Sequence, residues 1–458
     1  MLILPYSPRI IMLPRRHNIG MRNDAGLELK MFSMDQQSII FLTWIFFMLT
    51  YAGLALGKVP GLRMDRAGIA LVGATLMLLV GAVTLQEAFS ASSIDYETLV
   101  LLLGMMVVVG CLRLSGVFRL LAHWCLVRIE SPKGLLAVTI VLSGVLSAFL
   151  VNDIVCLALT PLVLHLTRRL RFNPLPHLIG LATASNIGST ATITGNPQNM
   201  IIGIQSHISY LRFATRLFPV ALLGLALNYF VIAVIYRRFL VPPKIVDVTG
   251  PILPEPLPPI RRAHQWLLGK SVLAASVAVV LFFALPSQSL PLIALGAAAF
   301  LLVGRIVRPE KIYQQIDWSL LMMFAGLFVV VHGFRMHVVE RWRIDGWTWL
   351  LNHPVDLLSG ASAVLSNLVS NVPAVLLFEP VMLAMPASNQ ETAWLALAMS
   401  STFAGNLTVL GSVANLIVVE NARREGVSIS FWEYCKVGVP LTLVTLVLGI
   451  VWLKFVFY

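Results

Sequence analysis

Polar residues interrupt the most apolar parts of this sequence at four places. Two are asparagine-containing tips, Val151-Asn152-Asp153 and Ser370-Asn371-Val372, and two are breaks, Gly195-Asn196-Pro197 and Gly411-Ser412. Within a membrane, side-chain amides, hydroxyls and freed backbone groups replace the water around a solute, and the start of a half-helix presents a positive dipole. We therefore expect a solute or ion site, with Na⁺ as one possible occupant, formed by Asn152, Asp153, Ser189, Thr192, Gly195, Asn196, Asn199, Ser370, Asn371, Thr408, Gly411, Ser412 and Asn415.

Hydroxyl and small residues also serve ordinary helix packing in membranes, which is the simpler interpretation of an isolated serine or threonine. The asparagines are different, because a buried amide is costly and these recur in pairs, Asn152 with Asn371 and Asn199 with Asn415. The pairs therefore favour function over packing.

Two acidic residues lie inside apolar sequence and are candidates for coupling to an ion gradient. Asp153 would repel an anionic solute unless it is protonated or holds a cation, so it is the first candidate for coupling to H⁺ or Na⁺. The alternative is that Asp153 only caps the half-helix that follows it. Glu379, just before Pro380, is the second candidate, as a proton relay or as a structural partner of a neighbouring helix. Apart from the coupling ion, no cofactor or resident metal is expected.

The composition requires a membrane protein to position these residues. Of the 458 residues, 58% are hydrophobic and 12% are charged, whereas soluble domains carry roughly 25% charged residues. At about 20 residues per crossing, the apolar sequence is enough for about ten crossings. We expect an all-α polytopic protein of the cytoplasmic membrane, with apolar runs at residues 38–57, 67–85, 97–112, 134–167, 179–206, 215–236, 270–285, 289–304, 318–334, 359–386, 393–420 and 437–457.

Four of these runs contain the polar interruptions. Runs 134–167 and 359–386 are long for one crossing and carry the tips at mid-length, which predicts two re-entrant hairpins. Runs 179–206 and 393–420 contain the breaks, which predicts two broken helices.

The net charge of +12 reflects basic cytoplasmic loops and needs no nucleic-acid partner. Placing the side richer in Lys and Arg in the cytoplasm puts both termini outside. The basic residues 1–33 fit this poorly, so either the start is mis-assigned and lies at Met31 or Met34, or the crossing count is off by one; we favour the first. Segments 117–128 and 341–352 mix Arg, His and Trp with aliphatic residues, as interfacial helices do.

The sequence contains an internal repeat. GATLMLLVG at 73–81 matches GAAAFLLVG at 296–304, and Ile94-Asp95-Tyr96 matches Ile316-Asp317-Trp318; the tips and then the breaks follow in the same order.

The repeat divides the chain into four parts: a basic tail at 1–33, a first membrane repeat at 34–240, a proline-rich cytoplasmic linker at 241–265 and a second repeat at 266–458. Because each half contains an odd number of crossings, the second repeat should be inverted relative to the first. Inverted repeats with broken helices place a site near the bilayer midplane and permit alternating access.

The motifs resemble a known group of transporters. SAFLVNDIVCLALTPLVL at 147–164, SNIGSTATITGNPQN at 185–199, SNVPA at 370–374 and GSVANLI at 411–417 are similar to the citrate-transporter-like and arsenite-permease-like branch of the ion transporter superfamily. That superfamily also contains sodium/proton antiporters and divalent-anion/sodium symporters. The resemblance covers nearly the whole chain from about residue 38. It implies a homodimer in which a mobile region, containing both hairpins and both broken helices, moves like an elevator against a scaffold.

The tips set this chain apart from the dicarboxylate symporters. Their tips read Ser-Asn-Thr and bind carboxylate and sodium, whereas only Asn152, Ser370 and Asn371 carry over here. The Asn-Asp tip resembles that of arsenite-permease-like proteins.

These observations favour a secondary active transporter in the lipid bilayer for a small anion or oxyacid, such as a carboxylate or arsenite, coupled to H⁺ or Na⁺. The alternative within transport is a Na⁺/H⁺ antiporter in which Asp153 exchanges the two cations. An intramembrane enzyme is disfavoured because catalytic sites are seldom duplicated. The polar breaks occur in both halves of this sequence, whereas the two candidate acids, Asp153 and Glu379, have no acidic residue at the equivalent position of the other half. A channel is disfavoured because inverted hairpins imply two gates. A scaffold without transport activity is disfavoured because both breaks keep their polar residues.

Overall fold

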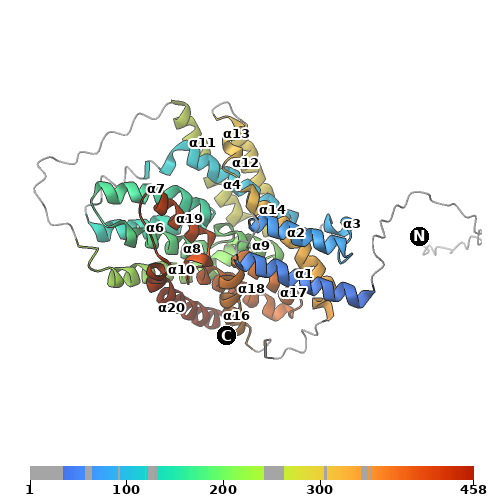
Figure 1. Cartoon of the computed structure of the whole chain (residues 1–458). Coiled ribbons are helices and arrows are strands. Elements are labelled where there is room, and N and C mark those ends of the chain that lie inside the picture. Colours follow the sequence, from blue (N-terminus) through green and yellow to red (C-terminus); the bar gives the residue numbers. More distant parts are fainter. Residues whose placement is uncertain are drawn as a thin grey trace, which may run out of the picture.

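A computed structural model describes residues 35–457, apart from residues 57–63, 91–92, 119, 122–128, 130, 242–261, 304–306, 342–348 and 351–352. Within these ranges all regular secondary structure is helical (Figure 1). The basic tail lies outside the described residues, as do most of the linker and most of the two segments predicted to be interfacial helices.

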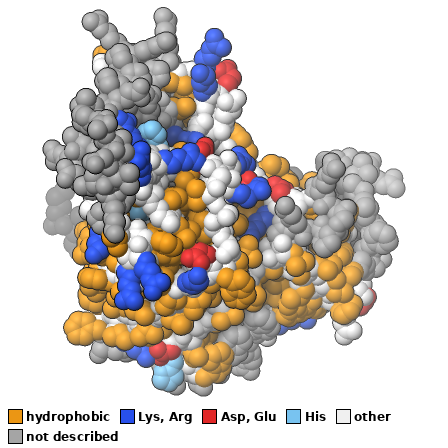
Figure 2. All heavy atoms as spheres, turned by 60° about the vertical axis from the view of Figure 1, so that its left-hand side comes forward, with side chains coloured by type: hydrophobic (Ala, Val, Ile, Leu, Met, Phe, Trp, Pro, Cys, Tyr) orange, Lys and Arg blue, Asp and Glu red, His pale blue; other side chains and the backbone are white. Residues whose placement is uncertain are grey.

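Seven of the described helices are long and apolar enough to cross a membrane. Six of them lie in predicted crossings, and the seventh, α6, is the first arm of a predicted hairpin. Hydrophobic side chains are exposed along their outer faces, for example Leu222 and Phe230 on α10 and Val447 on α20, and Figure 2 shows a broad hydrophobic surface. The chain is a multi-pass membrane protein. The seven helices are α1 (Gln36–Leu56), α4 (Tyr96–Ser115), α6 (Pro132–Phe149), α10 (Tyr210–Ile235), α11 (Arg262–Ala284), α14 (Trp318–His337) and α20 (Phe431–Phe457).

One set of helices, called here the paired group, consists of α1, α4, α11 and α14 together with α2 (Arg66–Leu79) and α12 (Leu290–Leu302). Its two tightest pairs use small residues at the crossing. A Cβ atom on Gly326 of α14 would lie 2.8 Å from the carbonyl carbon of Ala70 on α2, and one on Gly104 of α4 would lie 2.7 Å from that of Ala294 on α12. Both pairs therefore depend on close backbone approach, a common basis of helix association in membranes.

The other set, called here the hairpin group, contains both tips and both breaks. The two halves of the sequence are interleaved in it, because α7 packs on α19; likewise α2 packs on α14 in the paired group (Figure 1). Besides α6, α10 and α20, its helices are α7 (Asn152–Arg169), α8 (Pro174–Ser189), α9 (Pro197–Gln205), α16 (Pro354–Val369), α17 (Asn371–Leu383), α18 (Ala387–Ala404) and α19 (Val413–Arg424). The short helices α3 (Leu85–Ala88) and α13 (Pro309–Tyr313) lie between longer elements.

Both hairpins turn at the predicted tips. Leu150 is extended, and α7 begins at Asn152. Ser370 alone separates α16 from α17, with φ 78° and ψ 160°. That backbone region normally belongs to glycine and costs a serine about 1–3 kcal/mol, so the surrounding structure holds this tip in place.

Both broken helices are interrupted where the sequence predicts. A short 3₁₀ turn, Ile193–Gly195, lies between α8 and α9, and a second one, Val409–Gly411, lies between α18 and α19. The residues before the second half-helices share one backbone conformation, with φ and ψ of −148° and 145° at Asn196 and −143° and 144° at Ser412. The matched sequence segments therefore have matched local structure.

Candidate functional site

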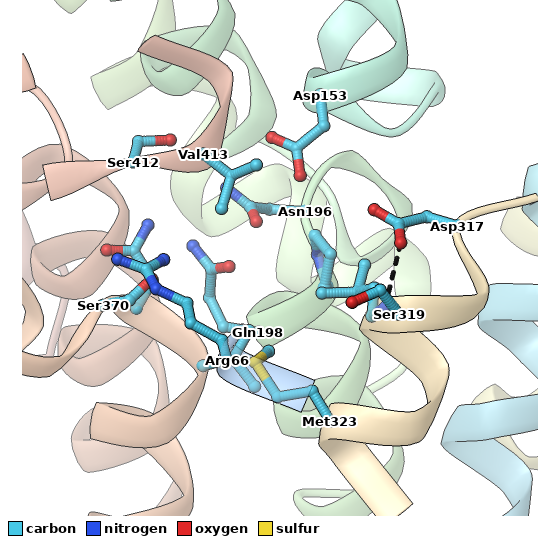
Figure 3. Close-up of a pocket in the computed structure, with 14 residues that line it drawn as sticks. Arg66, Asp153, Asn196, Gln198, Asp317, Ser319, Met323, Ser370, Ser412 and Val413 are labelled. Atoms are coloured by element: carbon cyan, nitrogen blue, oxygen red, sulfur yellow. Dashed lines mark hydrogen bonds between the residues drawn. The ribbon is translucent and has the colours of Figure 1, made fainter. Parts of the chain in front are cut away.

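A cavity of about 160 Å³ lies where the two tips and the two breaks meet (Figure 3). The hairpin group supplies most of its polar wall: Asp153, Asn196, Gln198, Ser370, Asn371 and Ser412. The paired group closes the other side with Arg66, Asp317, Ser319 and Met323. The cavity is thus an interface between the two groups of helices.

Six helices begin at this cavity: α2, α7, α9, α14, α17 and α19. Each helix start leaves backbone N–H groups without intrahelical acceptors and carries the positive end of the helix dipole. Six such ends around one space favour an anion or a solute rich in oxygen atoms.

Asn199 joins the two sides of the first break. Its amide nitrogen donates to the carbonyl oxygens of Ser189 and Thr192, at 3.0 and 3.1 Å. The backbone of the break is closely packed, because a Cβ atom on Gly195 would lie 2.4 Å from the carbonyl oxygen of Ser189. The hydroxyl of Thr192 donates to the carbonyl of Ala148 and so ties this break to the first hairpin.

Asn415 repeats that arrangement at the second break. Its amide nitrogen donates to the carbonyl oxygens of Gly405 and Thr408, at 2.7 and 3.1 Å. A Cβ atom on Gly411 would meet the carbonyl oxygen of Gly405 at 2.9 Å. Asn199 and Asn415 are fully buried and satisfy backbone carbonyls that the helix breaks release. They stand behind the cavity wall, which favours a structural role for both; the predicted role in binding stays a prediction.

Asn186, in the first broken helix, connects the two halves of the chain. Its amide nitrogen donates to the side-chain oxygens of Asn406 and Asn415, at 2.9 and 3.0 Å. Its oxygen accepts from Asn152, at 3.1 Å, and from the hydroxyl of Ser412, at 3.0 Å. Sequence reasoning did not select Asn186, although it is an amide within the quoted 185–199 motif.

Asn371 and Gln198 meet across the cavity. With the Asn371 amide oriented to satisfy its neighbours, its nitrogen donates to the carbonyls of Gly411 and Ser401, at 3.2 and 3.1 Å, and its oxygen accepts from Gln198 at 3.2 Å. Two buried oxygens, Oδ1 of Asn152 and Oε1 of Gln198, have no hydrogen-bond partner in the described part of the chain. Gln198 lines the cavity, so a solute hydroxyl or a cation there would satisfy its oxygen.

The wall from the paired group is held by helix caps. Asp65 accepts from the backbone N–H of Gly68 at 2.9 Å and from the hydroxyl of Ser319 at 2.9 Å, which together hold its pKa below the ordinary value. Asp317 accepts from the backbone N–H of Leu320 at 2.9 Å. These bonds fasten the start of α2 to the start of α14 and place Arg66 at the cavity.

Sequence reasoning missed this wall. In the sequence Arg66 is one of many basic residues between apolar runs, and Ser319 carries no signal. Asp317 did carry one, because the repeat pairs it with Asp95.

Glu379 does not reach the main cavity. It lines a second cavity, of about 40 Å³, with Asp95, Gln205, His332 and Arg335. Gln205 donates to the carboxylate of Asp95 at 3.1 Å. The coupling role predicted for Glu379 stays a prediction.

The remaining predicted residues fall into two sets. Asp153, Asn196, Ser370, Asn371 and Ser412 line the cavity. The others lie behind the lining residues or form the backbone of the breaks: Asn152, Ser189, Thr192, Gly195, Asn199, Thr408, Gly411 and Asn415.

Comparison with known proteins agrees with this architecture. The sequence pattern of the citrate transporter family matches residues 44–399 and 349–458. A "46 kDa membrane protein" of Mycobacterium leprae is 30% identical over 428 residues, covering 89% of this chain and 97% of its own length. A silicon efflux transporter of Oryza sativa subsp. japonica is 32% identical over 455 residues, covering 86% of this chain and 93% of its own.

A solved structure has the same fold. The YdaH transporter of Alcanivorax borkumensis superposes with a TM-score of 0.58 at 15% identity, covering 92% of this chain and 98% of that one. The resemblance noted in the tip and break motifs is therefore confirmed. The chain belongs to the citrate transporter family of membrane transporters.

Proposed function

We propose that this protein is a secondary active transporter for a small anion or oxyacid, coupled to H⁺ or Na⁺ and working by elevator-type alternating access. The observation that carries the proposal is the single cavity at which both tips, both breaks and six helix starts converge. Such a convergence supplies hydrogen-bond donors and positive dipole ends to a solute that has left water.

The solute class follows from the chemistry of the wall. The helix starts and the hydroxyl of Ser370 can donate to solute oxygen atoms, and the unpartnered Oε1 of Gln198 can accept from a solute hydroxyl group. The relative in Oryza sativa is named a silicon efflux transporter, and silicic acid is an uncharged oxyacid at neutral pH. We therefore include uncharged oxyacids, with arsenite and carboxylates, in the proposed class.

Asp153 is the proposed coupling residue. It lies in the first turn of α7 and lines the cavity. A negative carboxylate beside an anion is unfavourable, so a proton or a sodium ion would have to accompany the solute. The unpartnered oxygen of Gln198, which lines the cavity, is a further ligand available to such a cation.

The proposed movement is a displacement of the hairpin group against the paired group. In this proposal the hairpins are re-entrant and the two repeats are inverted. The matched backbone at Asn196 and Ser412 and the matched contacts of Gly104 and Gly326 support the duplication. We also propose, from the family resemblance, that the protein is a homodimer of the cytoplasmic membrane.

Reconstitution into liposomes tests the proposed function. Uptake of arsenite, silicic acid, citrate and succinate is measured with a pH gradient, with a sodium gradient and with neither, and empty liposomes serve as the control. We expect at least one solute to accumulate only when a gradient is present. Uptake equal to that of empty liposomes for every solute and gradient would contradict the proposal.

The second candidate is a Na⁺/H⁺ antiporter, which the position of Asp153 in the cavity favours. An internal pH dye distinguishes the two. Protons moved by a sodium gradient with no added anion or oxyacid would establish the antiporter and displace the anion proposal.

A further inference from the structure

We infer that Arg66 is a solute-binding residue that gives the cavity a fixed positive charge at one face of the membrane, with no equivalent at the matching position of the second repeat. The inference rests on the proposed transport function. It adds to that function a group that recognises anions and a difference between the two sides of the membrane.

Arg66 has no acceptor of its own within the described residues. It is the first residue of α2, is half-buried, and lines the cavity, where its side chain extends toward the second tip at Ser370 (Figure 3). No described carboxylate forms an ion pair with it, although Asp153 and Asp317 share the cavity. The neighbouring Asp65 is engaged by Gly68 and Ser319.

A guanidinium group in this position is suited to a ligand. It presents five N–H donors in a planar fork that matches a carboxylate or another oxyanion in two-point contact. A half-buried cation without an acceptor is unfavourable, and a bound oxyanion removes that cost. The hydroxyl of Ser370 and the backbone N–H groups at the start of α17, on another wall of the same cavity, would complete the contacts.

Arg66 belongs to the paired group, whereas most of the other polar lining belongs to the hairpin group. Its helix is fastened to α14 at two levels, through the contact of Asp65 with Ser319 and through the close approach of Ala70 to Gly326. When the hairpin group moves with its solute, Arg66 therefore stays behind.

The second repeat supplies the residues that correspond to this wall on the opposite face of the membrane. The α4–α12 pair has the same close contact as α14–α2, and Asp95 caps α4 with φ −76° and ψ 85°, against −82° and 83° for Asp317. The match of 73–81 with 296–304 places Ser289 where Arg66 stands in the first repeat. A hydroxyl thus stands in the second repeat where the first has the guanidinium. The cation near that face, Arg335, differs from Arg66 because it interacts electrostatically with Glu379 in the second cavity.

This difference predicts one-sided affinity. An anionic solute should bind more tightly from the face at which α2 and α14 begin than from the face at which α4 begins. An uncharged oxyacid should bind equally from both, because it does not sense the fixed charge. Arg308 and Lys311, just before α14, place the α2 face in the cytoplasm by the distribution of basic residues.

The experiment compares Arg66→Gln with Arg308→Gln, which removes the same charge from an exposed position outside the cavity. The solute concentration that gives half-maximal transport is measured from each side of oriented vesicles. Citrate and succinate serve as the anions, and arsenite and silicic acid as the solutes that are uncharged at pH 7. For wild-type protein and Arg308→Gln we expect anion affinity about tenfold or more tighter on the α2 face, the size of one charge-assisted contact. Arg66→Gln should abolish this difference and leave the uncharged solutes within about twofold, less than one such contact.

The reciprocal variant, Ser289→Arg, should tighten anion binding on the opposite face. Equal anion affinity on both faces of wild-type protein, or an unchanged difference in Arg66→Gln, would overturn the inference. If wild-type protein transports only uncharged solutes, the inference is wrong while the proposed function stands. If it transports none of the four, both fall.

Discussion

At the scale of single residues, the asparagines selected by their repetition divide into two kinds. Asn371 lines the cavity, whereas Asn199 and Asn415 face away from it and satisfy the backbone carbonyls of the breaks. Buried amides therefore have two positions here, one at the cavity and the other at the released carbonyl groups of an interrupted helix. The acids divide similarly, because Asp153 lies at the main cavity and Glu379 at the second one.

Replacing Asp153 with asparagine tests coupling at this scale. Asp153→Asn keeps the size of the side chain but can neither release a proton nor attract a cation strongly, so gradient-driven accumulation should be lost while solute exchange persists. Asp317→Asn is the matched control: it removes an acid from the same cavity, and its amide oxygen can still cap α14. Accumulation is measured in liposomes between about pH 5 and pH 8, a range that spans the titration of perturbed carboxyl groups. An unchanged pH profile in Asp153→Asn would remove this residue from the mechanism.

At the scale of elements, the breaks are compact structures rather than loose segments. Each has a 3₁₀ turn, a glycine against backbone oxygen atoms and an asparagine that bridges the gap. This local order allows α9 and α19 to begin at the cavity. Asn186 then joins the second break to the tip of the first hairpin.

A single methyl group tests the packing of the first break. In Gly195→Ala the new Cβ would lie 2.4 Å from the carbonyl oxygen and 2.7 Å from the Cα of Ser189, and backbone cannot yield as a flexible side chain does. We expect a loss of about 1–3 kcal/mol in the free energy of unfolding, typical of overpacking, seen as a lower melting temperature in detergent. Gly296→Ala in α12 is the control, because no atom lies within 4 Å of its new Cβ. It should be neutral or stabilising, since alanine is the better helix former. Equal melting temperatures for the two variants would contradict the packing seen at the break.

At the scale of the whole molecule, the two groups of helices do not coincide with the two halves of the sequence. The paired group joins α2 to α14 and α4 to α12, and the hairpin group joins α7 to α19, so these contact surfaces combine both repeats, whereas α6 with α8 and α16 with α18 each pack within one repeat. The cavity, the proposed solute site, lies between the groups, where relative movement would change access to it.

Cross-linking across the cavity tests that movement. Met323→Cys and Val372→Cys place one thiol on each group, and both positions line the cavity. Bifunctional thiol reagents of graded length should stop solute turnover in the double variant and leave solute binding detectable. The two single variants, treated identically, should keep their transport rates, which controls for native cysteines such as Cys435. Full turnover in protein shown to be cross-linked would exclude a displacement of one group against the other.

The sequence alone was sufficient to locate the tips, the breaks and the family, because polar and helix-breaking residues are conspicuous in apolar sequence. Lipid offers no partner for their backbone groups, so an interruption at Pro197 or Gly411 has few structural solutions. Only the tertiary structure decided which side chains face the cavity. Arg66 and Asp317 look in sequence like a loop cation and a helix cap, and they become part of the site because α2 packs on α14 beside the two tips. The orientations of Asn199 and Asn415 were likewise undetermined, since an amide that binds solute and one that satisfies a broken helix have the same chemistry and differ only in the direction they face.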